Sequence, residues 1–207
     1  VAEVVMEYLV EGFGNPSSIH SFGRKAKQAL EQARLKLATV IGSQPDELYF
    51  TSGGTEADNL AICGVAAANS KKGKHLITSC IEHHAILDTC KHLEDQGYEL
   101  TYLPVDNQGL VSVSAFENAI RPDTILATIM HVNNEVGTIQ DIAAMGRIAK
   151  DKGVIFHTDA VQSLGKLNID VNDLNVDLLT ASSHKIYGPK GVGCLYVKKG
   201  IRLHPIH

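Results

Sequence analysis

The feature of this sequence that most limits its fold is a repeated alternation of short apolar segments with segments whose apolar residues recur at helical spacing. The apolar segments predict strands at 48–51, 75–79, 100–105, 125–132, 154–157, 178–180 and 193–197. Helical patterns cover residues 1–10 and the stretch from a cap at Ser21 to a stop at Gly42, and others follow Gly54, Glu82, Val113 and Asp141. This alternation predicts an α/β fold in which helices cover both faces of a mostly parallel sheet.

Composition narrows the class of protein further. The chain has 207 residues, of which 44% are hydrophobic and 20% charged, so it can bury the core of one ordinary domain. A net charge of −4 without a basic block argues against nucleic acid as a partner. A membrane is also excluded as a partner, because no apolar run approaches the roughly 20 residues that span a bilayer. The four cysteines form no C-x-x-C pair, which favours free thiols in a reducing compartment.

Three polar segments stand at predicted strand ends, where open α/β sheets place their ligand sites. The first covers residues 51–57 (TSGGTEA), which leave a strand, turn through two glycines and open a helix. Free N–H groups at a helix N-terminus suit a phosphate, and glycines allow close approach of the backbone. The same pattern is typical of an ordinary turn capped by Ser52 or Thr55.

The second segment covers residues 156–162 (FHTDAVQ) and places Asp159 and Gln162 just after a strand. A carboxylate at this position can hold the protonated ring nitrogen of an electron-sink cofactor. The alternative is that Asp159 caps a short helix.

The third segment covers residues 181–191 (ASSHKIYGPKG) and carries Lys185 between a strand and a Gly/Pro turn. Lysine amines form Schiff bases with aldehydes, and partial burial lowers their pKa enough for them to react. Ser182 and His184 are placed to contact a phosphate beside it. The alternative is a surface lysine at a loop entrance.

Taken together in chain order, these segments resemble the NifS/IscS-like cysteine desulfurases, fold-type I pyridoxal-phosphate enzymes of the class V aminotransferase group. The resemblance runs nearly end to end through this chain. It is carried by GNPSSIH at 14–20, TSGGTEADN at 51–59, Glu82-His83, MHVNNE at 130–135, HTDAVQS at 157–163 and HKIYGPKG at 184–191.

The resemblance implies a complete cofactor site for pyridoxal 5′-phosphate. Lys185 would bind the cofactor covalently and then shuttle a proton, Asp159 would pair with the ring nitrogen, and Gln162 would hydrogen-bond the phenolic oxygen. His83 would stack on the ring and act as a second acid–base group, and Asn134 would face the substrate. The phosphate would be held by Gly54, Thr55, Ser182 and His184.

The implied reaction removes sulfur from L-cysteine, giving L-alanine and an enzyme persulfide that supplies an acceptor such as an iron–sulfur scaffold protein. The resemblance also implies a homodimer in the cytoplasm. Residues 1–207 would form the PLP-binding large domain. The persulfide-forming loop cysteine and the small C-terminal domain would lie outside this sequence, so we expect a fragment that is inactive alone.

Three alternatives remain open at this point: a selenocysteine lyase, another class V enzyme that transfers amino groups, and a truncated homologue that acts as a non-catalytic scaffold. We expect no metal at Glu82, His83 and His84, because adjacent histidines on a helix point in different directions. Cys63 and Cys194 are expected in the core, and none of the four cysteines stands at the place of the nucleophile.

Overall fold

The computed structural model describes residues 1–205, in which seven strands form one sheet in the order β1-β7-β6-β5-β4-β2-β3. The strands are β1 (Leu48–Thr51), β2 (His75–Ser79), β3 (Glu99–Leu103), β4 (Thr124–Thr128), β5 (Ile155–Asp159), β6 (Leu178–Ser182) and β7 (Gly193–Val197). β2 to β6 run parallel, whereas β7 runs antiparallel to both β1 and β6. The sheet is therefore mostly parallel, as the sequence predicts.

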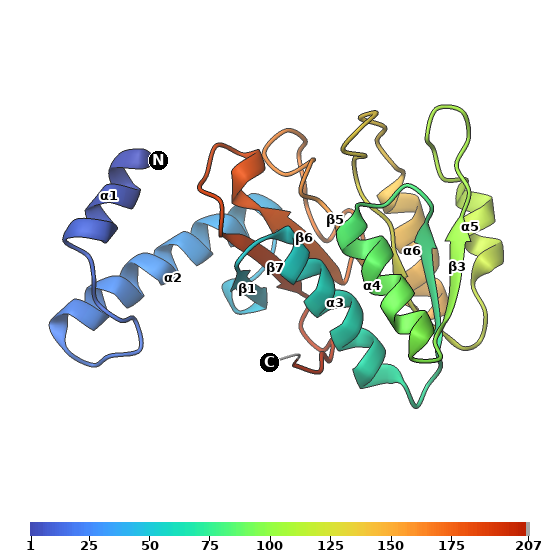
Figure 1. Cartoon of the computed structure of the whole chain (residues 1–207), viewed down its shortest axis with the longest axis horizontal. Coiled ribbons are helices and arrows are strands. Elements are labelled where there is room, and N and C mark those ends of the chain that lie inside the picture. The colour runs from blue at the N-terminus through green and yellow to red at the C-terminus, as the bar shows by residue number, and fades with distance from the viewer. Residues whose placement is uncertain (206–207) are drawn as a thin grey trace.

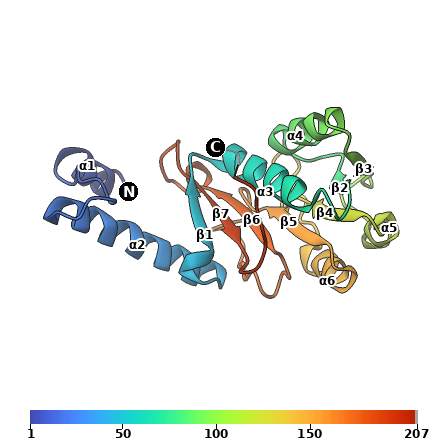
Figure 2. The same cartoon turned by 90° about the horizontal axis from the view of Figure 1, so that it is seen from below.

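Helices cover both faces of this sheet (Figure 2). They are α1 (Ala2–Val10), α2 (Ser21–Ile41), α3 (Gly54–Asn69), α4 (His84–Asp95), α5 (Val113–Ala119) and α6 (Ile142–Lys152), with short 3-10 turns η1 (Pro45–Glu47) and η2 (Ser183–Lys185). α3 and α4 pack on one face, and α5, α6 and the end of α2 pack on the other.

Each face of the sheet has its own hydrophobic core. Leu126 of β4 joins the core under α3 and α4, while its neighbour Ala127 joins the core under α5 and α6. All five residues of β4 are buried, because successive side chains of a strand point to opposite faces and both faces are covered here. No helix in residues 1–205 is long and apolar enough to cross a membrane.

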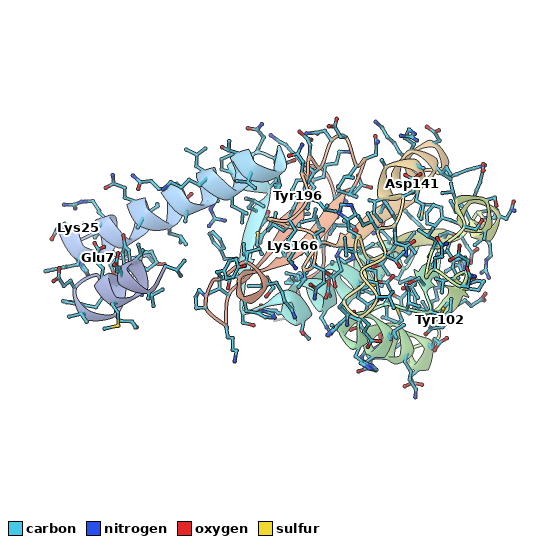
Figure 3. All side chains as sticks on the ribbon, turned by 90° about the horizontal axis from the view of Figure 1, so that it is seen from above. Glu7, Lys25, Tyr102, Asp141, Lys166 and Tyr196 are labelled. Carbon is cyan, nitrogen blue, oxygen red and sulfur yellow. The ribbon has the colours of Figure 1, made fainter. Side chains whose placement is uncertain are left out.

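The N-terminal arm, formed by α1 and the first half of α2, projects away from the sheet (Figure 1), whereas Arg34 and Leu37 of α2 contact β1 and the core. α1 buries none of its residues. It is tied to α2 by a ring stack of Phe13 on Phe22, whose centroids lie 5.5 Å apart. Figure 3 labels Glu7 and Lys25 on the two helices of this arm, at the opposite end of the molecule from Tyr102.

Several element ends differ from the prediction. β3, expected at 100–105, spans Glu99–Leu103, and β6, expected to end at Thr180, continues to Ser182. The cap of α2 is His20, whose Nδ1 accepts the Gly23 N–H at 3.2 Å, so Ser21 is the first helical residue instead of the cap. β4 was expected to run to Val132 but ends at Thr128. Beyond that point β2 is no longer alongside, and the Met130 N–H donates to the Glu82 carboxylate at 3.0 Å.

β5, in contrast, is longer at its C-terminal end than the sequence predicts. It was expected to end at His157 but continues to Asp159, which pairs with Thr180 of β6. The site residue therefore belongs to the strand itself, and the sheet holds its backbone. Gly42, with φ 71°, ends α2 as predicted, since a left-handed backbone conformation favours glycine.

Candidate active site

A cavity of about 170 Å³ opens where β5 and β6 end and α3 begins. Its wall contains every residue that the sequence resemblance assigns to the cofactor and the substrate, together with three that it does not: Asp58, Met130 and Val161. The assigned residues are Gly54, Thr55, His83, Asn134, Asp159, Gln162, Ser182, His184 and Lys185. Five separate segments of the chain thus meet at one point.

The end of this cavity for which the sequence predicts a phosphate site is built by the turn between β1 and α3. Ser52 donates its N–H and its hydroxyl to Glu56 Oε2, at 2.7 and 2.6 Å, which closes the turn. A Cβ on Gly54 would lie 2.9 Å from Val161 Cγ2, so only glycine allows this approach without a shift of the neighbour. The first N–H groups of a helix have no partner inside it and can bind an anion.

Side chains from β6 and η2 complete this end. Ser182 is buried and its Oγ lies 2.8 Å from His184 Nδ1. An adjoining cavity of about 360 Å³ is lined by both residues, by Gly54 and Thr55, and by Lys190. Lys190 adds a positive charge that the sequence reasoning did not assign to the site. Its position, five residues after Lys185 in the same polar segment, was the available signal.

Asp159, the last residue of β5, also lines the cavity. It is 6% exposed, and its Oδ1 accepts the Val161 N–H at 2.8 Å. Burial raises the pKa of this carboxyl group, while the Val161 N–H and the nearby His83 oppose that rise. The residues that follow form turns and no helix, so the alternative of a helix cap is wrong.

His83 lines the cavity and is the N-cap of α4. Its Nδ1 accepts the Ala85 N–H at 3.1 Å, which leaves the ring proton of the neutral form on Nε2. The side chain is otherwise exposed. Gln162 is half-buried, and its Oε1 accepts from Lys166 Nζ at 3.2 Å.

Lys185 is the last residue of η2 and lines the cavity, but its side chain is exposed. The expectation of partial burial is therefore wrong for the described chain. The loop around it is nonetheless fixed, because Gly188 donates its N–H to Ser183 O at 2.9 Å and Ser183 Oγ hydrogen-bonds Pro189 O.

Asp58 is the carboxyl group of this cavity to which the sequence interpretation assigned no role. It lies one turn into α3 and is 2% exposed, on the same buried side as Ala57, Ala61 and Ile62. A carboxylate among apolar residues of a buried helix was the signal that could have revealed it, since Asp is almost never buried without a partner.

A second and larger cavity, of about 560 Å³, adjoins the first and shares His83 and Asn134 with it. Cys80 is exposed on its wall. The other cysteines are also free: Cys90 and Cys194 are buried, and Cys63 is half-buried. Within residues 1–205 no three potential ligands lie close enough together to hold a metal ion.

Comparison with known proteins gives one consistent family. The family model described as aminotransferase class V matches residues 1–206. The cysteine desulfurase IscS of Dictyoglomus turgidum is 55% identical over 206 residues, covering 100% of this chain and 52% of the relative. The cysteine desulfurase IscS of Methanosarcina thermophila is 56% identical over 206 residues, covering 100% of this chain and 51% of the relative.

Solved structures agree with this. A structure described as SspA in complex with cysteine superposes with a TM-score of 0.97 at 46% identity, covering 100% of this chain and 60% of that one. The structure of a NifS-like protein superposes with a TM-score of 0.96 at 41% identity, covering 99% of this chain and 57% of that one. The chain spans about half the length of the curated relatives it matches.

Proposed function

This chain belongs to the class V aminotransferase family, and from that premise we propose that it is the cofactor-binding part of a pyridoxal-phosphate cysteine desulfurase. The proposed reaction removes sulfur from L-cysteine and leaves L-alanine and a persulfide. The observation that carries the proposal is that all the residues expected for cofactor and substrate line one cavity, although they come from five segments of the chain. The relatives described as cysteine desulfurases support the choice of reaction.

The chemistry of the cavity fits pyridoxal phosphate. One end offers the N-terminus of α3, the Thr55 and Ser182 hydroxyls and the His184 ring, all of which can bind a phosphate. The same cavity offers the buried Asp159 carboxyl group, which suits a protonated ring nitrogen. When bound, the cofactor supplies an electron sink for negative charge at the substrate's α-carbon.

The protein's own residues then have distinct tasks in this proposal. Asp159 keeps a proton on the ring nitrogen, and Gln162 orients the ring through its phenolic oxygen. Lys185 Nζ takes the proton from the α-carbon of the substrate and returns it. His83, whose Nδ1 is engaged by the Ala85 N–H, would contact the ring and exchange a second proton through Nε2, and Asn134 would orient the substrate.

Further parts of the proposal rest on the family resemblance. We place the nucleophilic cysteine outside residues 1–207 and expect this chain alone to be inactive. The persulfide would pass to an acceptor such as an iron–sulfur scaffold protein, and the enzyme would be a homodimer. The four free cysteines suit a reducing compartment, which supports a cytoplasmic location.

The test of the cofactor proposal is the visible absorption spectrum of the purified chain after addition of pyridoxal phosphate. We expect a band that borohydride removes, and we expect Lys185→Ala to abolish it. Lys152→Ala, at the end of α6 and outside the cavity, is the matched control and should keep the band.

A band that persists unchanged in Lys185→Ala would refute the role of this lysine. Assays of the longer protein then compare L-cysteine with L-selenocysteine as substrate. Turnover of selenocysteine alone would replace the proposed reaction with that of a selenocysteine lyase.

A further inference from the structure

Asp58 is a carboxyl group of the cavity to which the proposed reaction gives no role. Its side chain is 2% exposed and reaches the same cavity as Asp159. Thr180 of β6 hydrogen-bonds the carboxyl group, but Oδ1 has no hydrogen-bond partner among the described residues. A buried carboxylate with an unpaired oxygen is costly in free energy, because the charged form has lost its water.

The nearest candidate for a compensating cation is His157, whose Nε2 lies 3.7 Å from Asp58 Oδ1. His157 is completely buried between Thr128 and Thr180, at 2.8 and 3.0 Å from their hydroxyl oxygens. Burial lowers the pKa of this histidine to about 3. His157 is therefore neutral, and the contact with Asp58 is not an ion pair.

Asp159 is better placed to carry a charge. It accepts a backbone N–H from Val161, and His83 lies nearby. Buried carboxyl groups that share a site do not all ionise, because each charge repels the next. Glu82, a buried residue of the β2–α4 connection, is a second carboxyl group whose negative charge would act on Asp58. Burial, as the largest cause, together with the charges of Asp159 and Glu82, raises the pKa of Asp58 well above its ordinary value, and the hydrogen bond with Thr180 offsets only part of this rise.

We propose that Asp58 is a positioning residue that keeps its proton in the folded protein, so that Asp159 carries the negative charge in the cavity wall. This inference rests on the proposed function, because the single charge on Asp159 matches a single protonated ring nitrogen. An ionised Asp58 would place a second, uncompensated negative charge beside it.

The protonated state gives the buried polar groups one consistent hydrogen-bond direction. The Asp58 hydroxyl donates to Thr180, the Thr180 hydroxyl donates to His157 Nε2, and His157 Nδ1–H donates to Thr128. Loss of the Asp58 proton would reverse every one of these bonds. The His157 tautomer therefore reports the protonation of Asp58.

The first test is infrared spectroscopy of the chain without cofactor at neutral pH, in the region where protonated carboxylic acids absorb. We expect Asp58→Asn to remove one component of this absorption and Glu82→Gln to remove a different one. Asp46→Asn, in the exposed turn η1, is the matched control and should change nothing. A spectrum of Asp58→Asn identical to that of the parent in this region would overturn the proposal.

The second test needs no variant at Asp58. Nitrogen NMR of the histidine rings in the parent chain should show His157 as a neutral ring with its proton on Nδ1. A ring protonated on both nitrogens, or on Nε2 alone, would mean that Asp58 is ionised and the proposal is wrong. Neither test requires cofactor, so a chain that fails to bind pyridoxal phosphate refutes the proposed function separately.

Discussion

Among single residues, Glu82 has the most unusual environment outside the cofactor groups. Its Oε1 accepts the Ser79 hydroxyl at 2.5 Å and the Met130 N–H at 3.0 Å, while Oε2 has no partner among the described residues. Its carboxyl group accepts the backbone N–H of Met130 at the point where β2 has ended, while Ile129 and His131 donate their N–H groups to the backbone of β5. Burial, as the largest cause, raises the pKa of Glu82 to about 8.

This raised pKa predicts a specific loss of stability with pH. An acid with a raised folded-state pKa binds its proton more tightly folded than unfolded, so its contribution is fully present below about pH 4.5 and lost as the pH rises through about 8. A tenfold change in proton affinity is worth ~1.4 kcal/mol, so the loss is on the order of 3–5 kcal/mol. Glu82→Gln should remove most of this pH-dependent loss of stability.

The measurement is urea unfolding of the parent and Glu82→Gln at the two ends of this pH range. Glu117→Gln, exposed in α5, is the control and should follow the parent at both. Equal pH dependence of the parent and Glu82→Gln would show that Glu82 is ionised in the folded chain.

At the scale of elements, the first turn of α3 depends on β7. A Cβ built on Gly193 would lie 2.5 Å from the backbone carbon of Gly53, the N-cap of α3. Backbone cannot move aside as a flexible side chain can. The strand and the helix start are therefore in direct contact, and their spacing determines the shape of the cavity beside Gly54 and Thr55.

We predict that Gly193→Ala destabilises the chain by ~1–3 kcal/mol, the usual cost of overpacking. The reciprocal change, Gly53→Ala, is the control, because a Cβ there meets nothing within 4 Å and the φ of 163° is extended backbone. Denaturant unfolding of the two variants should separate them clearly. Equal stability would mean that β7 and α3 adjust freely to each other.

The elements also show what a sequence pattern can and cannot predict. β2 and β7 have the predicted bounds, because each is a short apolar run between polar or glycine residues. The end of β4 was wrong because it depends on Glu82, a residue 48 positions before Met130. The antiparallel direction of β7 could not be predicted, since an apolar run carries no direction.

The same limit applies to the site. The residues at strand ends and at the helix start could be predicted to converge, since parallel strands end at one edge of the sheet. Asp58 could not, because it lies inside a helix and acquires its neighbours Thr180 and His157 only through tertiary packing. The roles proposed for all of them remain for the spectra and variants to test.

For the molecule as a whole, stability is expected to be concentrated in the sheet and absent from α1. α1 buries no residue, whereas Phe116 of α5 is fully buried in the core. We predict that deletion of residues 1–11 shifts the thermal unfolding midpoint of this chain by less than ~2 °C, or under ~1 kcal/mol.

Phe116→Ala is the contrasting variant and should cost ~3–5 kcal/mol, which lowers the midpoint by ~10 °C. Both are measured by circular dichroism on heating. A fall of similar size on deletion of residues 1–11 would contradict the prediction and show that α1 supports the sheet.

The pairing of β1 with β7 also determines when β1 can join the sheet during protein synthesis. Leu48 pairs with Tyr196 and Thr51 with Gly193, and β1, at the edge of the sheet, has no other strand beside it. At about 5–20 residues per second, β1 leaves the ribosome on the order of ten seconds before its partner exists. The turn at Gly53 and Gly54 is anchored only then, so a nascent chain completes this side of the cavity after nearly all of its other strands have formed.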